Sequence, residues 1–396
     1  MVADSKIADS PQSNQSKGGA NSQPDRAKHA QESTPAPASA QVPAPQAETG
    51  APETGSGGSG GSGTSTRRAD SIFAGIAKGA GIVIIVLLGA VTFFLVSQSY
   101  PAFLASNETL QSEVGFTRGM SFWTFAAAAL FGTVLSAVIA LAVATPLAIG
   151  IALFISHYAP RKFASGIGYV IDLLAAIPSV VFGLWGMYTL EPVIRPIFAW
   201  ISGVLTPVLE WWVAYVPGMG WMAENVSWWP LTPELVHFVP PARNILMGGL
   251  VLAIMILPII TALCREVFVQ TPRLQEEAAL GLGATRWEMI RMTVLPIGRS
   301  GIVSAAMLGL GRALGETMAL LMVLSSGLKI NFFLMSPGQH STIASQIALN
   351  WPEAQAGLER QFLIGLGLLL FILTFLVNFA ARRVVARYAE FSGANA

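Results

Sequence analysis

The sequence predicts an all-α integral membrane protein with six transmembrane helices and a disordered N-terminal tail. The prediction rests on the apolar share of the chain, its low charge and six long apolar segments. Of the 396 residues, 53% are apolar and 11% are charged, whereas soluble domains carry about 25% charged residues. This composition argues against a soluble enzyme. The net charge of +1 also gives no basic surface for a nucleic acid.

The N-terminal tail is predicted to cover residues 1–70. It contains no Phe, Trp, Tyr or Leu, and residues 55–63 read GSGGSGGSG, which is a flexible linker composition. Such a segment buries too little apolar surface to offset the entropy lost on ordering. We therefore expect disorder, and the alternative is a tail that docks on a partner. No apolar run follows the first residues, so a secretory signal is not expected.

Six apolar segments are long enough to cross a bilayer, which takes about 20 helical residues. They are residues 79–97, 122–156, 168–190, 245–264, 301–328 and 362–381. The second is too long for one straight crossing, and we expect Pro146 to kink it. The predicted domain plan is a first helix with an external loop (71–121), a transmembrane domain (122–383) and a C-terminal tail (384–396).

Lysine and arginine residues predict the orientation, because they are enriched in cytoplasmic flanks. With the N-terminus inside, the inside flanks hold Arg67, Arg68, Lys78, Arg161, Lys162, Arg265, Arg273, Arg286, Arg291, Arg299, Arg382, Arg383 and Arg387. The outside loops then hold Arg118, Arg195, Arg243, Lys329 and Arg360. Because the inside flanks hold thirteen of these residues and the outside loops five, we expect a cell-membrane protein with both termini in the cytoplasm.

The external segment 191–244 is rich in tryptophan. Six of the ten tryptophans fall here: Trp200, Trp211, Trp212, Trp221, Trp228 and Trp229. Prolines are expected to break the segment into short pieces. Since tryptophan favours the headgroup level of a membrane, we expect an interfacial or re-entrant segment. A direct role toward the substrate is the alternative.

The inside loop 265–300 is predicted to form two short helices. Thr271-Pro272 suits an N-cap followed by the first helical residue, and Gly283 suits a C-terminal stop. Thr285 and Glu288 have capping-box spacing and start the second helix. Methionine and aromatic side chains on that helix suit a protein–protein contact. The alternative is an amphipathic loop that rests on the membrane surface.

The same loop resembles the EAA loop of ABC-importer permeases. The family pattern is Glu-Ala-Ala, three residues, Gly, nine residues, Ile, one residue and Leu-Pro. The residues that match are Glu277, Ala278, Ala279, Gly283, Leu295 and Pro296. Thr293 stands where the family has Ile. The resemblance implies the type I ABC-importer permease architecture, in which this loop couples the membrane helices to an ATP-binding subunit.

No phosphate-binding loop of the form G-x-x-x-x-G-K-[ST] occurs in the chain. If ATP drives transport, ATP and Mg must therefore be bound by a separate ATPase. We expect a transport subunit rather than an enzyme, with no cofactor of its own. The single cysteine and four histidines show no metal-ligand spacing, so no metal site is expected. A carrier or channel that uses an ion gradient is the alternative.

Two charged residues lie within the fifth predicted span. Arg312 and Glu316 are four residues apart and would share one face of a continuous helix. Charged residues inside a membrane are costly and often mark a transport path. We expect Arg312 to contact an oxyanion through its planar fork and Glu316 either to orient Arg312 or to restrain binding so that the anion can leave. A self-neutralising pair that only fixes helix packing is the alternative.

Two further segments resemble the phosphate-importer permeases. They are AIPSVVFGLWG at residues 176–186 and GLGRALGETMA at residues 309–319. The ending Thr317-Met318-Ala319 is closer to the C subunit of such importers than to the A subunit. The resemblance implies three partners: a second permease of the A type, an ATPase dimer and an external phosphate-binding protein. A permease for another oxyanion, such as sulfate or molybdate, is the alternative.

Overall fold

The computed structural model describes residues 63–226 and 230–393. The predicted disordered tail covered residues 1–70, of which residues 1–62 lie outside this part of the chain. Residues 63–70 were wrongly assigned to the tail, because they form the start of α1. Residues 70–396 form one compact unit, and it is described here by itself. Its α-helices are α1 (Gly63–Leu104), α2 (Asn107–Glu113), α3 (Phe122–Leu153), α4 (Arg161–Ala175), α5 (Ser179–Trp185), α6 (Glu191–Tyr215), α7 (Met219–Asn225), α8 (Ile245–Val269), α9 (Arg273–Gly281), α10 (Arg286–Met289), α11 (Leu295–Leu314), α12 (Met318–Val323), α13 (Ile343–Asn350) and α14 (Leu358–Gly393).

Short helical turns join several of these helices. Three are π-helical and continue a neighbouring α-helix: η2 (Phe154–Tyr158), η3 (Gly186–Leu190) and η5 (Ile290–Val294). Two are 3₁₀ turns on connecting segments: η1 (Gly115–Thr117) and η4 (Pro233–Leu235). The residues predicted as a C-terminal tail begin inside α14, which continues to Gly393.

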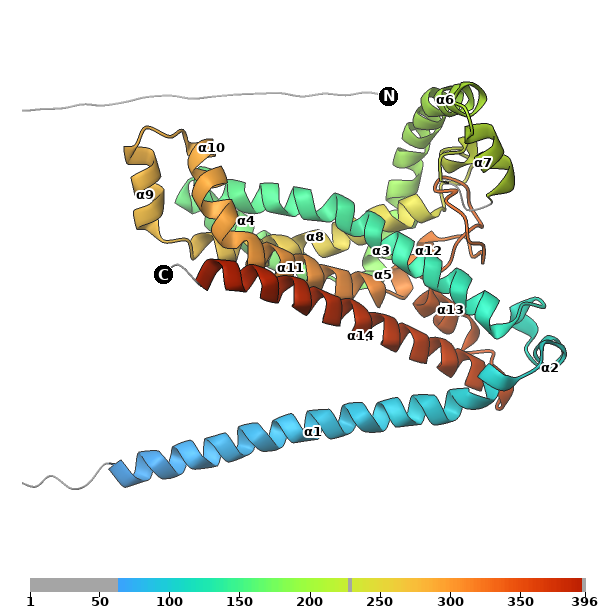
Figure 1. The fold of residues 1–396 in the computed structure, drawn as a ribbon, viewed down its shortest axis with the longest axis horizontal. Coiled ribbons are helices and arrows are strands. Elements are labelled where there is room, and N and C mark those ends of the chain that lie inside the picture. Colours follow the sequence, from blue (N-terminus) through green and yellow to red (C-terminus); the bar gives the residue numbers. More distant parts are fainter. Residues whose placement is uncertain (1–62, 227–229, 394–396) are drawn as a thin grey trace, which may run out of the picture. The chain divides into compact units, whose positions relative to one another are not determined.

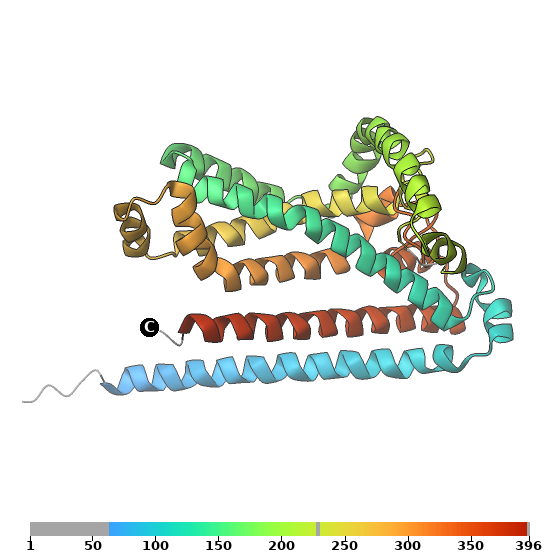
Figure 2. The same cartoon turned by 45° about the horizontal axis from the view of Figure 1, so that its top comes forward.

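Six helices of the described residues are long and apolar enough to cross a membrane, as predicted. They are Phe73–Leu104, Phe122–Tyr158, Ser179–Tyr215, Ile245–Val269, Arg286–Leu314 and Leu358–Arg383. The second runs through Pro146 without a break. Figures 1 and 2 show α9 and α10 at one end of the long helices and α2 and α13 at the other.

The third predicted span, residues 168–190, is wrong as one continuous helix. Helix α4 ends at Ala175, and α5 begins at Ser179 after Ile177-Pro178. Proline disfavours helical geometry at the residue before it, so the chain turns there. The segment after residue 190, predicted as short pieces, instead contains α6, which holds Pro196 and Pro207 within it.

The fifth predicted span, residues 301–328, is also interrupted. Helix α11 ends at Leu314 with Gly315 as its C-cap, and the short α12 starts at Met318. Upstream, the helix begins earlier than predicted, because α10, η5 and α11 join into one helix from Arg286. The residues predicted to start the span therefore lie in the middle of it.

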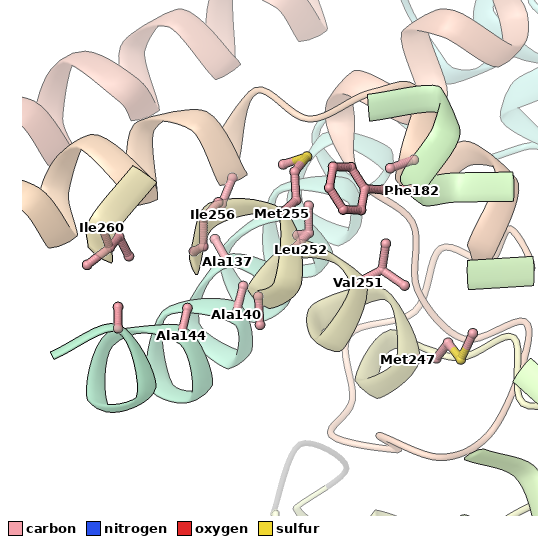
Figure 3. Packing of buried hydrophobic residues seen from close by; sticks show 14 of the residues in the cluster. Ala137, Ala140, Ala144, Phe182, Met247, Val251, Leu252, Met255, Ile256 and Ile260 are labelled. Carbon is pink, nitrogen blue, oxygen red and sulfur yellow. The ribbon is translucent and has the colours of Figure 1, made fainter. Parts of the chain in front are cut away.

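The core forms where α3 packs along α8, as Figure 3 shows at close range. The facing side of α3 is a row of buried alanines at Ala137, Ala140, Ala144, Ala148 and Ala152. Small side chains let helix backbones approach closely. The side of α8 in this cluster carries Val251, Leu252, Met255, Ile256 and Ile260. Residues of α10, η5 and α11 pack in the same core cluster as these two helices.

Candidate functional site

The cytoplasmic loop of the prediction folds as two helices joined at a glycine. Helix α9 ends at Gly281, and Gly283 has a backbone φ of +89°, which L side chains rarely adopt. The amide of Ala284 donates to the carbonyl of Ala279 at 3.2 Å and closes the turn. The capping box between Thr285 and Glu288 is present and starts α10. The two predicted helices and their glycine junction are therefore confirmed.

The start of α9 differs from the prediction by one residue. Pro272 is the N-cap, and the helix begins at Arg273 without a side-chain cap. The hydroxyl of Thr271 is buried and has no hydrogen-bond partner among the described residues. Thr271 therefore does not cap this helix.

Helix α9 presents an uncovered surface. It contains no buried residue, and Leu274 and Leu282 are 80% and 90% exposed. Glu277 and Ala278 point outward, whereas Ala279 is half-buried against the core. Two strongly exposed leucines beside a carboxylate are typical of a surface that a partner covers. Three residues of the motif are thus divided between an outward and an inward face.

The second half of the motif connects this surface to the membrane helices. Leu295 and Pro296 form the first turn of α11, where proline is tolerated. Trp287 and Leu295 line an apolar cavity of about 520 Å³ together with residues of α3 and η2. Met289 and Ile290 are buried. Through these two residues α10 and η5 belong to the same buried core as α3, and η5 continues directly into α11.

A polar contact that sequence reasoning missed ties α9 to the end of α3. Glu276 Oε1 lies 3.4 Å from His157 Nε2, and the other ring nitrogen of His157 lies 2.7 Å from Ser156 Oγ. The His157 side chain is 9% exposed. The two partners are 119 residues apart in sequence, so no local pattern indicates the pairing. This contact fixes α9 on the π-helical end of α3.

The predicted charge pair in the fifth span does not form. Among the described residues, no ion pair joins Arg312 to Glu316. Since α11 ends at Leu314, the two side chains do not share a helix face. Glu316 is buried, and its carboxylate accepts the Ala319 N–H at 3.1 Å. Glu316 thus holds the start of α12, and the prediction that it orients Arg312 is wrong.

Arg312 lines a cavity of about 1100 Å³ between α8, α11 and α14. The cavity wall includes the polar side chains of Ser304, Asn378 and Arg382 and the apolar side chains of Met307 and Leu308. Sequence reasoning counted Arg382 only as a flanking charge and did not single out Ser304 or Asn378. Two guanidinium groups and neutral hydrogen-bonding groups in one cavity suit an oxyanion.

Comparison with known proteins adds the family. The model of the binding-protein-dependent transport system inner membrane component matches residues 144–390, which is more than half of the chain. The phosphate transport system permease protein PstC 2 of Mycobacterium tuberculosis is 42% identical over 320 residues, covering 80% of this chain and 92% of the relative. The chain belongs to the PstC permeases.

Other relatives agree. PstC of Mycobacterium leprae is 40% identical over 81% of this chain and 94% of its own, and PstC of Mesorhizobium japonicum is 35% identical over 82% and 92%. A solved structure of the MetNI methionine ABC transporter, in an inward-facing conformation, covers 67% of this chain and 93% of that chain. Its TM-score is 0.39 and its identity 18%. As a PstC permease, the chain is a multi-pass membrane transport component and not an enzyme.

Proposed function

We propose that this chain forms one half of the membrane path of an ATP-driven phosphate importer. The similarity to phosphate transport permeases over four fifths of the chain supports the substrate class. The cavity that holds Arg312 and Arg382 is the observation that carries the proposal, because it offers two cationic forks between membrane helices. Phosphate meets Arg312 in passing, since tight binding there would slow its release.

The loop at Glu277–Gly283 is the coupling element in this proposal. Its exposed leucines seat in a groove of a separate, PstB-like ATPase that holds ATP and Mg. Closure of the ATPase dimer displaces α9, and α10, η5 and α11 transmit the motion toward Arg312. Glu277, Ala278 and Ala279 form the contact helix, Gly283 is its hinge, and Leu295 and Pro296 start the helix that moves.

The remaining partners complete the importer. A PstA-like permease contributes the second half of the path, and a PstS-like binding protein delivers inorganic phosphate from outside. Both termini then lie in the cytoplasm, with the tail at residues 1–70 on the same side as the coupling loop. This orientation agrees with the lysine and arginine residues that flank the predicted spans.

Reconstitution with the three partners tests this function. The complex in liposomes is expected to transport labelled phosphate only when ATP is supplied on the side of the membrane where the ATPase is bound. Phosphate is also expected to stimulate ATP hydrolysis. Competition by sulfate and molybdate separates the substrate classes. Uptake of sulfate but not phosphate would overturn the phosphate assignment, and uptake by this chain alone without ATP would favour a carrier.

A further inference from the structure

The Trp-rich helix α6 carries an uncovered apolar stripe on one side. The stripe repeats at intervals of three and four residues, which places its members on one helix face. It consists of Val193, Ile197, Trp200, Val204, Val208, Trp211 and Tyr215, each 48% to 72% exposed. It runs nearly the whole length of α6 and contains no charged residue.

The opposite side of α6 is fixed to the protein. Ile194 and Phe198 are buried, and Phe198 packs edge-on against Phe238 with 6.0 Å between ring centroids. Ser202 accepts the backbone N–H of Phe238 at 3.1 Å. This face contacts the protein from Ile194 to Leu209, although Leu205 and Trp212 on it are each 40% exposed. The stripe lies on the other side of the helix.

Polar contacts fix the N-terminal end of α6. The Glu191 carboxylate accepts three hydrogen bonds from the Arg195 guanidinium, two at 2.8 Å and one at 3.0 Å, and a fourth from the Ala242 N–H at 3.1 Å. Arg195 and Glu210 both lie off the stripe by helix geometry. Charged groups are thus confined to the sides of α6 that the stripe leaves free.

The direction of α6 decides what covers the stripe. Figures 1 and 2 show α6 standing across the long axes of α8 and α14, at the end opposite α9 and α10. The continuous helix Ser179–Tyr215 has 37 residues, or about 55 Å at 1.5 Å per residue, against a hydrocarbon core of about 30 Å. The whole helix is therefore too long for one straight crossing, and α6 is the part of it that stands across the long axes of the other helices.

We propose that α6 lies flat in the external membrane interface, with the stripe turned into the lipid headgroup and acyl boundary. Tryptophan and tyrosine prefer this depth, and the aliphatic residues between them suit a surface helix that partitions into lipid. Tyr188, just before α6, is also 73% exposed. The third crossing then consists of α4, α5 and η3.

Spin labelling of the assembled importer in liposomes tests the proposal. Cys264 is replaced by alanine, and a nitroxide is attached at Val204→Cys on the stripe or at Glu210→Cys, an exposed control off the stripe. The label at residue 204 is expected to collide more with oxygen than with a water-soluble nickel chelate. The label at residue 210 is expected to show the reverse preference.

Two results would overturn the proposal. Equal access of the nickel chelate to both labels would place the stripe in water, and shielding of residue 204 from both reagents would mean that a protein covers it. If the Val204→Cys chain does not assemble, quenching of tryptophan fluorescence by brominated lipids tests the proposal without a spin label. Replacing both Trp200 and Trp211 with Phe is expected to reduce this quenching. Unchanged quenching would contradict the proposal. Neither the spin-label accessibility nor the fluorescence quenching depends on phosphate or ATP.

Discussion

Arg312 stands near the end of α11, with its side chain on the wall of a cavity rather than beside Glu316. Sequence reasoning selected it because a charge within an apolar run is costly. The same reasoning failed for Glu316, since four-residue spacing implies a shared face only if the helix continues. Gly315 ends the helix first. A single apolar run does not reveal where a helix inside it stops.

Replacing Arg312 by glutamine is expected to lower phosphate uptake while leaving the complex assembled. A hydrogen bond to a charged group contributes about 1.5–3 kcal/mol, which corresponds to roughly a ten- to hundredfold loss. Uptake of labelled phosphate measures the transport rate, and size-exclusion chromatography shows whether the complex assembles. Arg360→Gln, in the first turn of α14, is the matched control. Loss of assembly in Arg312→Gln would instead assign Arg312 a packing role.

His340 makes the loop between α12 and α13 sensitive to acid. Burial lowers the pKa of His340, although the hydrogen bond to the Asn331 carbonyl at 2.7 Å acts in the opposite direction. Its Nδ1 is buried and has no partner among the described residues. Because the folded pKa is lowered, the unfolded loop binds the proton more readily. The free energy of unfolding of this loop is therefore highest above about pH 6.5, and it decreases as the pH falls below that value.

Hydrogen exchange of residues 331–342 between pH 7.5 and pH 5 measures this effect. Faster exchange is expected at the lower pH in the native chain, after correction for the intrinsic pH dependence of exchange. His340→Gln cannot take up the proton and is expected to lose the excess. An excess that persists in His340→Gln would assign the sensitivity to another group.

Among the elements, helix boundaries were predicted well where local chemistry sets them. The Thr285–Glu288 capping box and the turn at Gly283 follow from side-chain and backbone preferences. The break before Pro178 and the continuity of α6 through its prolines were not predicted. Neighbouring polar groups and local 3₁₀ or π turns can satisfy the backbone groups that a proline leaves free, and a single sequence does not show where these partners lie. The pairing of His157 with Glu276 was missed for the same reason.

Gly283→Val is expected to uncouple ATP hydrolysis from phosphate uptake. A β-branched residue at φ +89° costs on the order of 1–3 kcal/mol, and the turn between α9 and α10 would shift to relieve it. Gly281→Ala is the matched control, since its added Cβ meets nothing within 4 Å and its φ is not positive. The ratio of phosphate transported to ATP hydrolysed is the measurement. An unchanged ratio in Gly283→Val would remove the hinge role.

For the whole molecule, composition alone predicted the class and the number of spans. The described chain agrees, and the packing of α3 on α8 explains why the small residues of α3 form one row. The arrangement of the broken helices at the end opposite α9 and α10 could not be predicted from the sequence. It depends on contacts such as Glu191 with Ala242, which join segments 51 residues apart.

Deleting residues 1–62 is expected to leave phosphate uptake within about twofold of the full chain. The segment lacks the apolar side chains that a packed domain needs, and α1 begins after it at Gly63. Uptake in cells, normalised to the amount of protein in the membrane, measures the effect. A transporter that is present but inactive would show that the tail has a required partner.

We expect a separate ATPase to bind α9 and to move the membrane helices by displacing it. A photo-crosslinking amino acid at Leu282, which is 90% exposed, tests it in working membranes. The same amino acid at Val83 on α1 is the lipid-facing control. Residue 282 is expected to join the ATP-hydrolysing subunit, with a yield that changes when ATP is hydrolysed, whereas residue 83 is not. Absence of the ATPase from the products at residue 282 would contradict the account.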